Sequence, residues 1–311
     1  MGSSAVRGSR RTASDAILRQ LADQHRRVLS PWRALVLLRR ATMSTPASDH
    51  RWSRLPESIL DVLPIIRTMA RNGDLAPLPD HGDLYQVSTP YAQMLQLDER
   101  EILAELDPWL MVSHLSALTF HGLTVQVPQV IMVRTPRYGI PQIPPVDSRP
   151  EDWEGIAAPP IVRPDSILGT PVTWQVIPSE HYLGFEDDQP YGATLRVTTT
   201  ERTLIDGLQR PDLSGGIENV FRAWVIAAPV LDLDQVVDIV DRLGDSVLSQ
   251  RVGFVLERLG LTHPVLDRWR VAAGRGASSR LVGAEPSAPS FDERWNLSIN
   301  APTEALDDDA A

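Results

Sequence analysis

The sequence predicts an α+β protein of mixed α/β class, in which an N-terminal winged helix-turn-helix is followed by a larger mixed α/β domain. Three observations lead to this prediction. The chain has 311 residues, which is enough for two ordinary domains. Residues 14–87 contain three helical patterns and then a hairpin pattern, which is the element order of a winged helix. Beyond them, apolar β-branched segments precede a run of helices, which indicates a second domain with a sheet.

Capping residues and the spacing of apolar residues predict three N-terminal helices. The second is expected to begin at Ser30, which suits an N-cap and precedes a proline. The third is expected to open at residues 55–57 and to end at residues 71–73. Pro64 lies inside this third helix and removes one backbone donor. We therefore expect a kink or a break near residues 61–63.

A hairpin with strands at residues 75–78 and 84–87 is predicted next. In the second domain, the unbroken apolar segment 130–133 is predicted as a central strand that is buried on both faces of the sheet. Residues 136–171 are rich in proline and are predicted as a surface loop. The predicted organisation is a disordered basic tail (1–13), a winged-helix DNA-binding domain (14–95), a larger second domain (96–302) and an acidic tail (303–311).

The composition excludes several classes of protein. The chain contains no Cys, which excludes disulfide bonds, a thiolate nucleophile and Cys-ligated metal sites. No stretch approaches 18 consecutive apolar residues, so no membrane span is expected. The basic N-terminal residues lack the apolar core of a signal peptide. We therefore expect the protein to be cytoplasmic.

Charge is distributed unevenly along the chain, whose 30 basic residues are all arginines. Residues 1–71 contain 13 Arg and five acidic residues, a net charge of +8, whereas the other 240 residues contain 17 Arg and 35 acidic residues, a net charge of −18. A basic N-terminal part attached to an acidic body favours a nucleic-acid contact made by the N-terminal part alone. The alternative is compositional drift in an arginine-rich proteome.

The predicted winged helix supplies the candidate DNA-binding residues, because a guanidinium group can pair with guanine or with a phosphate. Arg67 and Arg71 lie four residues apart and therefore share one face of the predicted recognition helix. The candidate set also includes arginines that precede this helix: Arg33, Arg39, Arg40, Arg51, Arg54, Arg67 and Arg71. The alternative is a protein-interaction domain whose arginines form only a solvated face.

No residue pattern points to a catalytic site, a metal site or a cofactor. The seven histidines lack metal-ligand spacing, and His114 and His121 fit capped or core positions better than ligands. The carboxylates at residues 186–188 lie in a predicted turn. Asp206 lies in an apolar segment, where a carboxylate is often functional, but pairing with Arg202 four residues earlier is the simpler interpretation. We therefore expect no catalytic residue, no metal and no cofactor.

Three segments of the second domain form motifs that are specific in combination. They are SHLSALTFHGLT (113–124) with its continuation to residue 137, VTTTERTLID (197–206) with RPDLSGGIE (210–218), and RVGFVLERLG (251–260). In order and spacing they resemble the AbiEi family, the antitoxins of AbiE-type toxin–antitoxin systems, a type IV class that acts in abortive phage infection. The closing segment DERWNLSIN (292–300) is similar to the last strand of many members.

The resemblance implies a winged helix that binds operator DNA and represses its own operon. It also implies a C-terminal domain that neutralises a nucleotidyltransferase-like toxin, with or without a direct complex. Polar residues near the motifs are therefore candidates for the antitoxin function: Arg134, Arg137, Glu201, Arg202 and Asp206. For the last three, a capped helix N-terminus with an Arg202–Asp206 pair is the simpler interpretation. Arg134 and Arg137 are expected at an exposed edge, where side chains commonly serve partners.

The sequence thus predicts a non-enzymatic antitoxin whose partners are operator DNA and a toxin, with no membrane contact. Two alternatives from other classes stay open. One is a plain transcriptional regulator with an effector-binding C-terminal domain. The other is an enzyme that modifies the toxin or a nucleotide.

Overall fold

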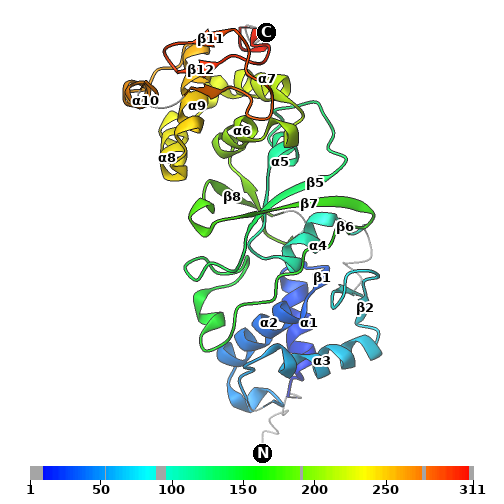
Figure 1. Cartoon of the computed structure of the whole chain (residues 1–311). Coiled ribbons are helices and arrows are strands. Elements are labelled where there is room, and N and C mark those ends of the chain that lie inside the picture. The colour runs from blue at the N-terminus through cyan, green and yellow to red at the C-terminus, as the bar shows by residue number, and fades with distance from the viewer. Residues whose placement is uncertain (1–9, 53, 89–95, 190–191, 275–277, 308–311) are drawn as a thin grey trace, which may run out of the picture. The chain divides into compact units, whose positions relative to one another are not determined.

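The computed structural model describes residues 10–52, 54–88, 96–189, 192–274 and 278–307. The chain forms two compact units (Figure 1). The N-terminal unit comprises residues 1–110, 138–168 and 188–195, and the C-terminal unit comprises residues 111–137, 169–187 and 196–311. Both units combine helices with a sheet, which confirms the predicted mixed α/β class. The predicted tails lie only in part outside the described residues, at residues 1–9 and 308–311. The prediction of a tail from residue 303 is wrong for residues 304–306, because they form a short 3-10 helix whose Leu306 is buried in the core of the C-terminal unit.

The N-terminal unit contains a winged helix with the element order α1–β1–α2–α3–β2–β3, in which three helices and a hairpin follow one another as predicted. The hairpin strands β2 and β3 pair antiparallel, and β1 adds to β3, so that the small sheet has the order β1-β3-β2. Strand β1 was not predicted from the sequence. The elements of this unit are α1 (Ala13–Asp23), β1 (Val28–Leu29), α2 (Pro31–Ser44), α3 (Ile59–Arg71), β2 (Leu75–Pro77), β3 (Tyr85–Val87), α4 (Glu99–Leu106) and β6 (Ser166–Ile167).

The N-termini of the three winged-helix helices are capped by side chains. Thr12 and Asp15 form a capping box on α1, and Ser58 and Asp61 form another on α3. Ser30 caps α2 by accepting a hydrogen bond from the backbone N–H of residue 33, as its sequence position predicted. These caps set the start of each helix, so that its apolar face meets the shared core.

Helix α3 is one continuous helix, and the predicted break at Pro64 is wrong. The helix begins at Ile59, later than the sequence suggested, so Pro64 lies only five residues from the helix start. The missing N–H of Pro64 therefore forgoes a single intrahelical hydrogen bond near the end of the helix. Val62, Ile66 and Met69 on the inner face are fully buried and hold α3 on α1 and α2.

The N-terminal unit is larger than the predicted domain 14–95. Helix α4 belongs to it, and so do residues 138–168 and 188–195. The proline-rich segment is therefore more than a surface loop, because it contributes the buried residues Val146 and Asp152. The reason is electrostatic, since carboxylates from these later segments pair with arginines of the winged helix, as described below.

The C-terminal unit contains a sheet whose strands follow the order β7-β5-β4-β9-β8. Strand β5 lies between β7, which is parallel to it, and β4, which is antiparallel, so its predicted central position is confirmed. Burial on both faces is confirmed only in part, because Ile131 and Met132 are partly exposed and Val133, Arg134 and Thr135 are buried. The strands are β4 (Met111–Val112), β5 (Ile131–Pro136), β7 (Thr170–Ile177), β8 (Phe185–Asp188) and β9 (Leu195–Thr198).

Helices enclose the main core of this unit, and a second small sheet has the order β10-β12-β11. Gly253 lies inside α9 because the Trp295 ring packs on it, and a Cβ there would lie 2.1 Å from a ring carbon. The remaining elements are α5 (His114–Phe120), α6 (Thr200–Gln209), α7 (Ile217–Ala227), α8 (Leu233–Leu243), α9 (Ser246–Arg258), α10 (Val265–Ala273), β10 (Ser279–Arg280), β11 (Phe291–Asp292) and β12 (Leu297–Ser298).

Candidate nucleic-acid interface

The outer face of α3 is the candidate nucleic-acid interface. Leu60, Pro64, Arg67 and Arg71 follow a spacing of four, three and four residues, which places them on one face of the helix. All four are exposed, and the Leu60 side chain has a relative exposure of 74%. This outer face is apolar in its first half and cationic in its second half. It is the side of the helix opposite the buried Val62.

Arg67 and Arg71 are not neutralised by any carboxylate in the described part of the chain. The Arg71 guanidinium donates weakly to the Arg67 carbonyl (3.4 Å) and to the Thr68 hydroxyl (3.2 Å). Both arginines line a groove between α3 and the hairpin, together with Pro77 and Tyr85. Two free guanidinium groups at the rim of a groove can pair with phosphates or with guanine edges.

The hairpin itself is acidic. Asp74, Asp80 and Asp83 lie in or beside it, and residues 72–88 contain no arginine. Carboxylates repel a phosphate backbone, so the hairpin is a poor phosphate clamp. The candidate cationic surface of this winged helix therefore consists of α3 and the segments around residues 10–11 and 51–54.

Those segments add exposed arginines to the candidate interface. Arg51 is exposed, and Arg54 is exposed while it pairs with Glu57 at 3.0 Å. Backbone hydrogen bonds in both directions hold residue 11 beside residues 49–51, which brings Arg10 and Arg11 close to Arg51. Arg10 and Arg11 were not among the predicted DNA-binding residues and join the candidates here, although the basic character of the N-terminal tail was already a signal for them.

The arginines of α2 have a different role, which corrects their prediction as DNA contacts. Arg33 is fully buried and Arg39 is 3% exposed. Arg39 donates to the carbonyls of Pro56 (2.6 Å) and Glu154 (2.8 Å). Arg40 is a quarter exposed and pairs with Asp152. These guanidinium groups bind other parts of the same unit, so Arg33 and Arg39 are removed from the candidate interface.

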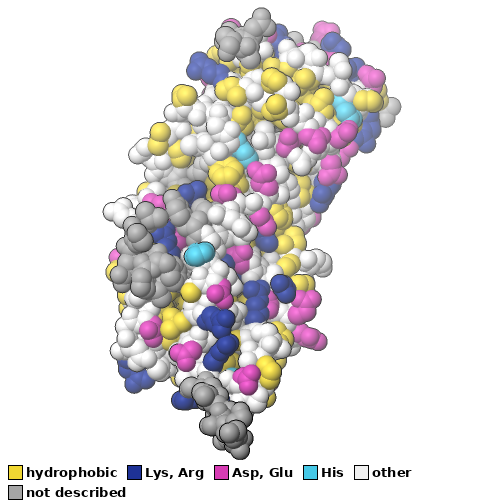
Figure 2. All heavy atoms as spheres, turned by 180° about the vertical axis from the view of Figure 1, so that it is seen from behind, with side chains coloured by type: hydrophobic (Ala, Val, Ile, Leu, Met, Phe, Trp, Pro, Cys, Tyr) yellow, Lys and Arg dark blue, Asp and Glu magenta, His cyan; other side chains and the backbone are white. Residues whose placement is uncertain are grey.

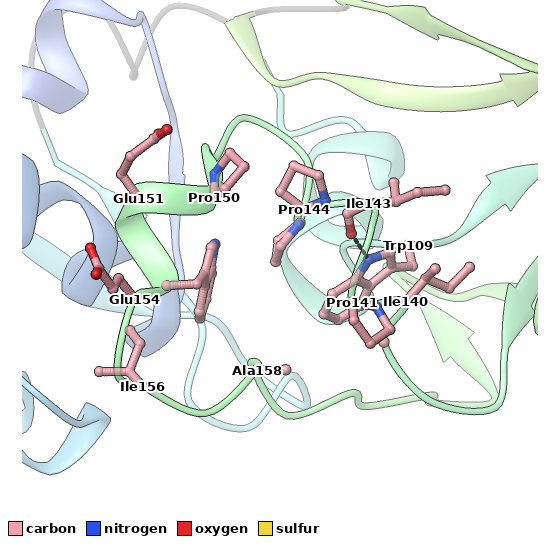
Figure 3. Close-up of a pocket in the computed structure, with 13 residues that line it drawn as sticks. Trp109, Ile140, Pro141, Ile143, Pro144, Pro150, Glu151, Glu154, Ile156 and Ala158 are labelled. Atoms are coloured by element: carbon pink, nitrogen blue, oxygen red, sulfur yellow. Dashed lines mark hydrogen bonds between the residues drawn. The ribbon is translucent and has the colours of Figure 1, made fainter.

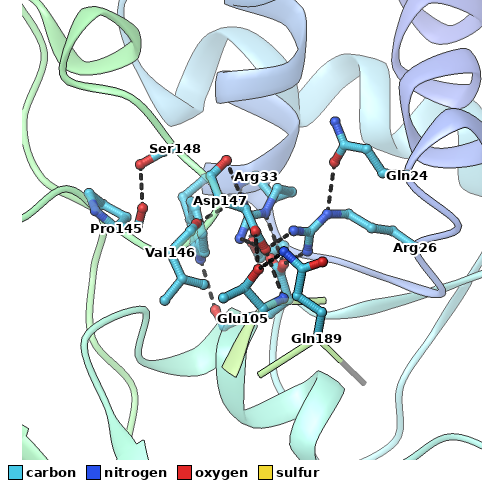
Figure 4. Close-up of polar contacts among 12 residues, drawn as sticks. Gln24, Arg26, Arg33, Glu105, Pro145, Val146, Asp147, Ser148 and Gln189 are labelled. Atoms are coloured by element: carbon cyan, nitrogen blue, oxygen red, sulfur yellow. Dashed lines mark hydrogen bonds and ion pairs between the residues drawn. The ribbon is translucent and has the colours of Figure 1, made fainter. Parts of the chain in front are cut away.

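A buried ion network explains this burial (Figure 4). The Glu105 carboxylate accepts from Arg26 at 3.0 Å, from Arg33 at 2.9 Å and from the Ser30 hydroxyl at 2.5 Å. Asp147 pairs with Arg26 and accepts from the Thr194 backbone N–H. Both carboxylates thus come from chain segments outside residues 14–95 and neutralise cations that the winged helix alone would leave buried and unpaired.

The pKa values in this network follow from burial and from neighbouring charges. Burial lowers the pKa of Arg33 to about 10, assisted by the nearby Arg26 cation. Burial alone would raise the pKa of Asp147, but Arg26 and Arg33 outweigh it and hold that pKa below its ordinary value. Both groups therefore stay charged near neutral pH, and the network holds the unit together electrostatically.

The charge contrast along the sequence does not carry over to the two units. The N-terminal unit contains 16 Arg and 19 acidic residues, a net charge of −3, and the C-terminal unit contains 14 Arg and 21 acidic residues, a net charge of −7. On the face shown in Figure 2, basic and acidic side chains are mixed rather than separated. The expectation of a basic head is therefore wrong at the level of the folded unit, and only local cationic surface remains.

The C-terminal unit contains a second buried network around Asp206. The Asp206 Oδ1 atom accepts from Arg134 at 2.6 Å and from Arg202 at 2.8 Å. Burial would raise the pKa of Asp206, but the two arginines outweigh it and lower that pKa. The predicted Arg202–Asp206 pair is confirmed. The expectation that Arg134 is exposed is wrong, because strand β5 directs its side chain into the interior, where 4% of it is exposed.

His114 completes this network. It is fully buried, and its backbone has a φ of 51°, in the left-handed region. Its Nδ1 atom lies 2.9 Å from the Ser113 hydroxyl and its Nε2 atom lies 3.5 Å from an Arg134 nitrogen. Burial and the Arg134 cation lower the pKa of His114 to about 3, so the imidazole is neutral. A core role, as predicted, is confirmed.

The other two antitoxin candidates differ in exposure. Arg137 is exposed, as expected, at the end of β5. Glu201 is mostly buried and accepts a hydrogen bond from the backbone N–H of Asp232 at 3.3 Å. Thr199 caps α6 in front of it. Glu201 and Arg202 thus serve the local structure of the helix, which leaves Arg137 as the accessible member of the set.

The motifs that carry the family resemblance are buried in part. Some of their residues lie in the interior of the C-terminal unit, whereas others, such as Phe120, Arg210 and Asp212, are exposed. Ser113 and His114 of the first motif meet Asp206 of the second through the Arg134 guanidinium. In the third, Gly253 packs under Trp295 of the closing segment. The exposed residues of the motifs and of their continuation, Arg137 among them, therefore stay candidates for a partner surface on this unit.

The described residues give no sign of a metal site or a membrane span. Within them, no group of three or more His, Cys, Asp or Glu side chains is placed to hold a metal ion. No helix in this part of the chain has the length and apolar character needed to cross a membrane.

Comparison with known proteins leaves the function open. No family model matches the chain, and no curated protein matches it. Among solved structures, the chain is similar to the crystal structure of the RV2827C protein from Mycobacterium tuberculosis, with 16% sequence identity and a TM-score of 0.48. The similarity covers 96% of this chain and 95% of that chain. The function therefore has to be argued from the residues of this chain.

Proposed function

We propose that this protein is a DNA-binding antitoxin of the AbiEi type, which represses its own operon and neutralises a nucleotidyltransferase-like toxin. The observation that carries the DNA-binding part is the pair of exposed, un-neutralised arginines on the outer face of α3. In a winged helix this is the helix that enters the major groove. Arg67 and Arg71 contact phosphates or guanines, and Leu60 and Pro64 offer apolar contact to thymine methyl groups.

The antitoxin part is supported by the resemblance of the motifs in the C-terminal unit to the AbiEi family. The buried motif residues are structural, so the neutralising surface is made by exposed residues of this unit. Arg137 is the exposed polar candidate near the motifs. The enzyme alternative receives no support from Asp206 and His114, because both side chains are fully buried and engaged with Arg134.

The two activities should be tested with point variants of the full chain. A fragment that starts at residue 96 would leave α4 and residues 138–168 without the winged helix and would expose Glu105 and Asp147. Loss of function in such a fragment would reflect misfolding. The variant that isolates DNA binding is the double substitution Arg67→Ala, Arg71→Ala, because neither side chain contributes to the core.

DNA binding is measured by fluorescence anisotropy with the DNA upstream of the protein's own gene, across a range of salt concentrations. Each lost phosphate contact should reduce the log–log salt slope by about 0.9, so the double variant should flatten it by up to about two units. Arg222→Ala, on an exposed position of α7, is the matched control and should change neither affinity nor slope. An unchanged slope in the double variant would exclude α3 as the DNA contact.

Toxin neutralisation is measured by growth rescue when the chain is co-expressed with the adjacent gene. The double variant should lose repression and keep rescue, because neutralisation belongs to the C-terminal unit. Arg137→Glu should weaken rescue and leave DNA affinity unchanged. If the Arg67→Ala, Arg71→Ala variant is folded and expressed but fails to rescue, the proposed division between the units is wrong.

A further inference from the structure

A cavity of about 620 Å³ lies within the N-terminal unit, beside the 3-10 turn η3 (Pro150–Trp153) (Figure 3). Trp109, Ile140, Pro141 and Ile143 form one wall, and Pro150 and Ile156 lie across from them. A volume of this size is typical of small-molecule sites, which are mostly apolar and carry a few polar groups. The proline-rich segment therefore folds into a concave apolar surface.

The walls of this cavity are held in place before any ligand arrives. The Trp109 indole N–H donates to the Ile143 carbonyl at 2.7 Å, and the Trp153 indole N–H donates to the Ser148 hydroxyl at 2.8 Å. Gly139 allows the chain to lie directly on the Trp109 ring, because a Cβ there would lie 2.6 Å from a ring carbon. A preformed site loses little conformational entropy on binding.

The charge at the cavity selects the ligand class. Its charged lining residues are Glu151 and Glu154, both exposed, and no arginine is among the lining residues. Their carboxylates lie beside η3 rather than between the two walls (Figure 3), and from this rim position they attract a cation and repel an anion. The partly exposed Trp153 indole adds a π-face that attracts a cation as well. An apolar ring that carries a protonated amine satisfies both the walls and the charge.

The cavity is also connected to the segment that leads into α3. One Arg39 nitrogen donates to the carbonyl of Glu154, which lines the cavity, and another donates to the carbonyl of Pro56, two residues before Ser58, the N-cap of α3. Arg40 pairs with Asp152 in η3, and the Trp32 and Trp153 rings lie 6.1 Å apart. A ligand that contacts residues 153–154 therefore lies one hydrogen bond from the guanidinium that also holds the segment before α3.

We propose that this cavity is an effector site for an aromatic amine in its protonated form, and that occupancy alters the DNA affinity of α3 through Arg39. The proposal that the cavity binds an aromatic amine does not depend on the proposed DNA-binding function. The regulatory half rests on the proposed DNA-binding function. The two halves are tested separately, so that a failure of one is distinguishable from a failure of the other.

Binding is tested by calorimetry on the full chain with 1-naphthylmethylamine as the probe and 1-naphthylacetate as its anionic match. The amine should bind at micromolar concentrations, and the acetate should bind at least about tenfold more weakly, equivalent to about 1.4 kcal/mol. The double variant Glu151→Gln, Glu154→Gln should abolish this preference, and both side chains are exposed, so the fold is retained. Absence of amine binding at millimolar concentration would overturn the proposal.

A second variant pair locates the binding. Ala158→Trp fills the cavity and should weaken amine binding by at least about tenfold, equivalent to about 1.4 kcal/mol. Ala157→Trp is the matched control, because Ala157 is an exposed neighbour that does not line the cavity. Equal amine affinity in the two variants would show that the amine binds elsewhere and would overturn the site.

The regulatory half is tested by measuring DNA affinity with and without saturating amine. Occupancy should change it at least about fivefold in the original chain and leave it unchanged in Ala158→Trp, since coupling between sites is commonly 5–150-fold. Amine binding without any change in DNA affinity would overturn the coupling. If the chain binds no operator DNA at all, the proposed function fails, while the calorimetric result still decides the site.

Discussion

Helices α2 and α3 are neighbours in the same winged helix and both carry arginines, but the arginines of α2 are mostly buried in ion pairs and hydrogen bonds whereas those of α3 are exposed. On α2, Arg33 and Arg39 are buried and engaged with groups from distant parts of the chain. On α3, Arg67 and Arg71 are exposed and un-neutralised by the described carboxylates. Residue type and local charge are the same in both sets, so neither determines which arginine is free to meet a ligand.

The difference lies in what packs against each helix. The outer face of α2 is covered by α4 and by the proline-rich segment, which deliver Glu105, Asp147 and Asp152 to it. No described segment of its unit covers the outer face of α3, which borders a groove. An arginine is therefore part of the scaffold where a later segment supplies a carboxylate, and it stays accessible to a partner where none arrives.

The largest effect expected from this comparison is on the α2 network. Glu105→Gln removes the charge that Arg26 and Arg33 share and leaves buried cations without adequate compensation. The free energy of unfolding of the N-terminal unit should fall by about 3–5 kcal/mol, as measured by urea denaturation. Glu57→Gln, on an exposed pair with Arg54, is the control and should cost less than about 1 kcal/mol. Similar losses in both variants would remove the contrast between scaffold and surface ion pairs.

The second prediction concerns the pH dependence of stability that His114 produces in the buried network of the C-terminal unit. The pKa of His114 is about 3 in the folded state, below the ordinary value of 6.5. As the pH falls, the imidazole is therefore protonated in the unfolded chain at a higher pH than in the folded chain. The His114 contribution to stability is fully present above pH 6.5 and is lost between pH 6.5 and about 3. Its slope approaches about 1.4 kcal/mol per pH unit in the middle of that window.

His114→Asn is the variant that isolates this contribution, because Asn tolerates the left-handed backbone of that position. Stability should be measured between pH 6.5 and 4.5, above the range in which carboxylates dominate. The variant should show a shallower dependence than the original chain. Identical slopes would mean that the imidazole is protonated in the folded state, and the buried network would then carry one more positive charge.

The smallest effect is expected on α3. Arg67→Ala and Arg71→Ala should each change the free energy of unfolding by less than about 0.5 kcal/mol, because both side chains are exposed and lack an ion pair with a described carboxylate. The same thermal or urea denaturation used for Glu105→Gln provides the measurement. A loss above about 2 kcal/mol in either variant would place that arginine in the scaffold together with Arg33.

Local features of this protein were predictable where local physics decides them. The Ser30 cap of α2 and the Arg202–Asp206 pair depend on residues within four positions of each other, and both were correct. The alternation of helices and hairpin that defines the winged helix is equally local. Strand β1 was missed because it has two residues and exists only by pairing with β3. Pro64 was misjudged because its effect depends on where the helix starts.

The candidate interface was predictable only in part. Seven arginines were plausible from charge, but the sequence contains no local signal that separates Arg33 from Arg67. The contacts that separate them join residues 26–40 to residues 105, 147, 152 and 154, across more than 60 intervening positions in each case. The cavity beside η3 could not be predicted from the sequence either. A proline-rich segment has no hydrophobic periodicity that indicates which of its residues face inward.

The sequence by itself determined the class of fold, the winged-helix element order, the caps of its helices and the absence of thiol chemistry. These depend on turn chemistry, on hydrophobic period and on composition, all of which act between near neighbours. Tertiary structure alone decided which charges are neutralised, because burial of a cation is tolerated only where a distant carboxylate arrives to meet it. The N-terminal part of the sequence is basic, but both folded units have a net negative charge. The guanidinium groups of Arg67 and Arg71 stay exposed on the outer face of α3.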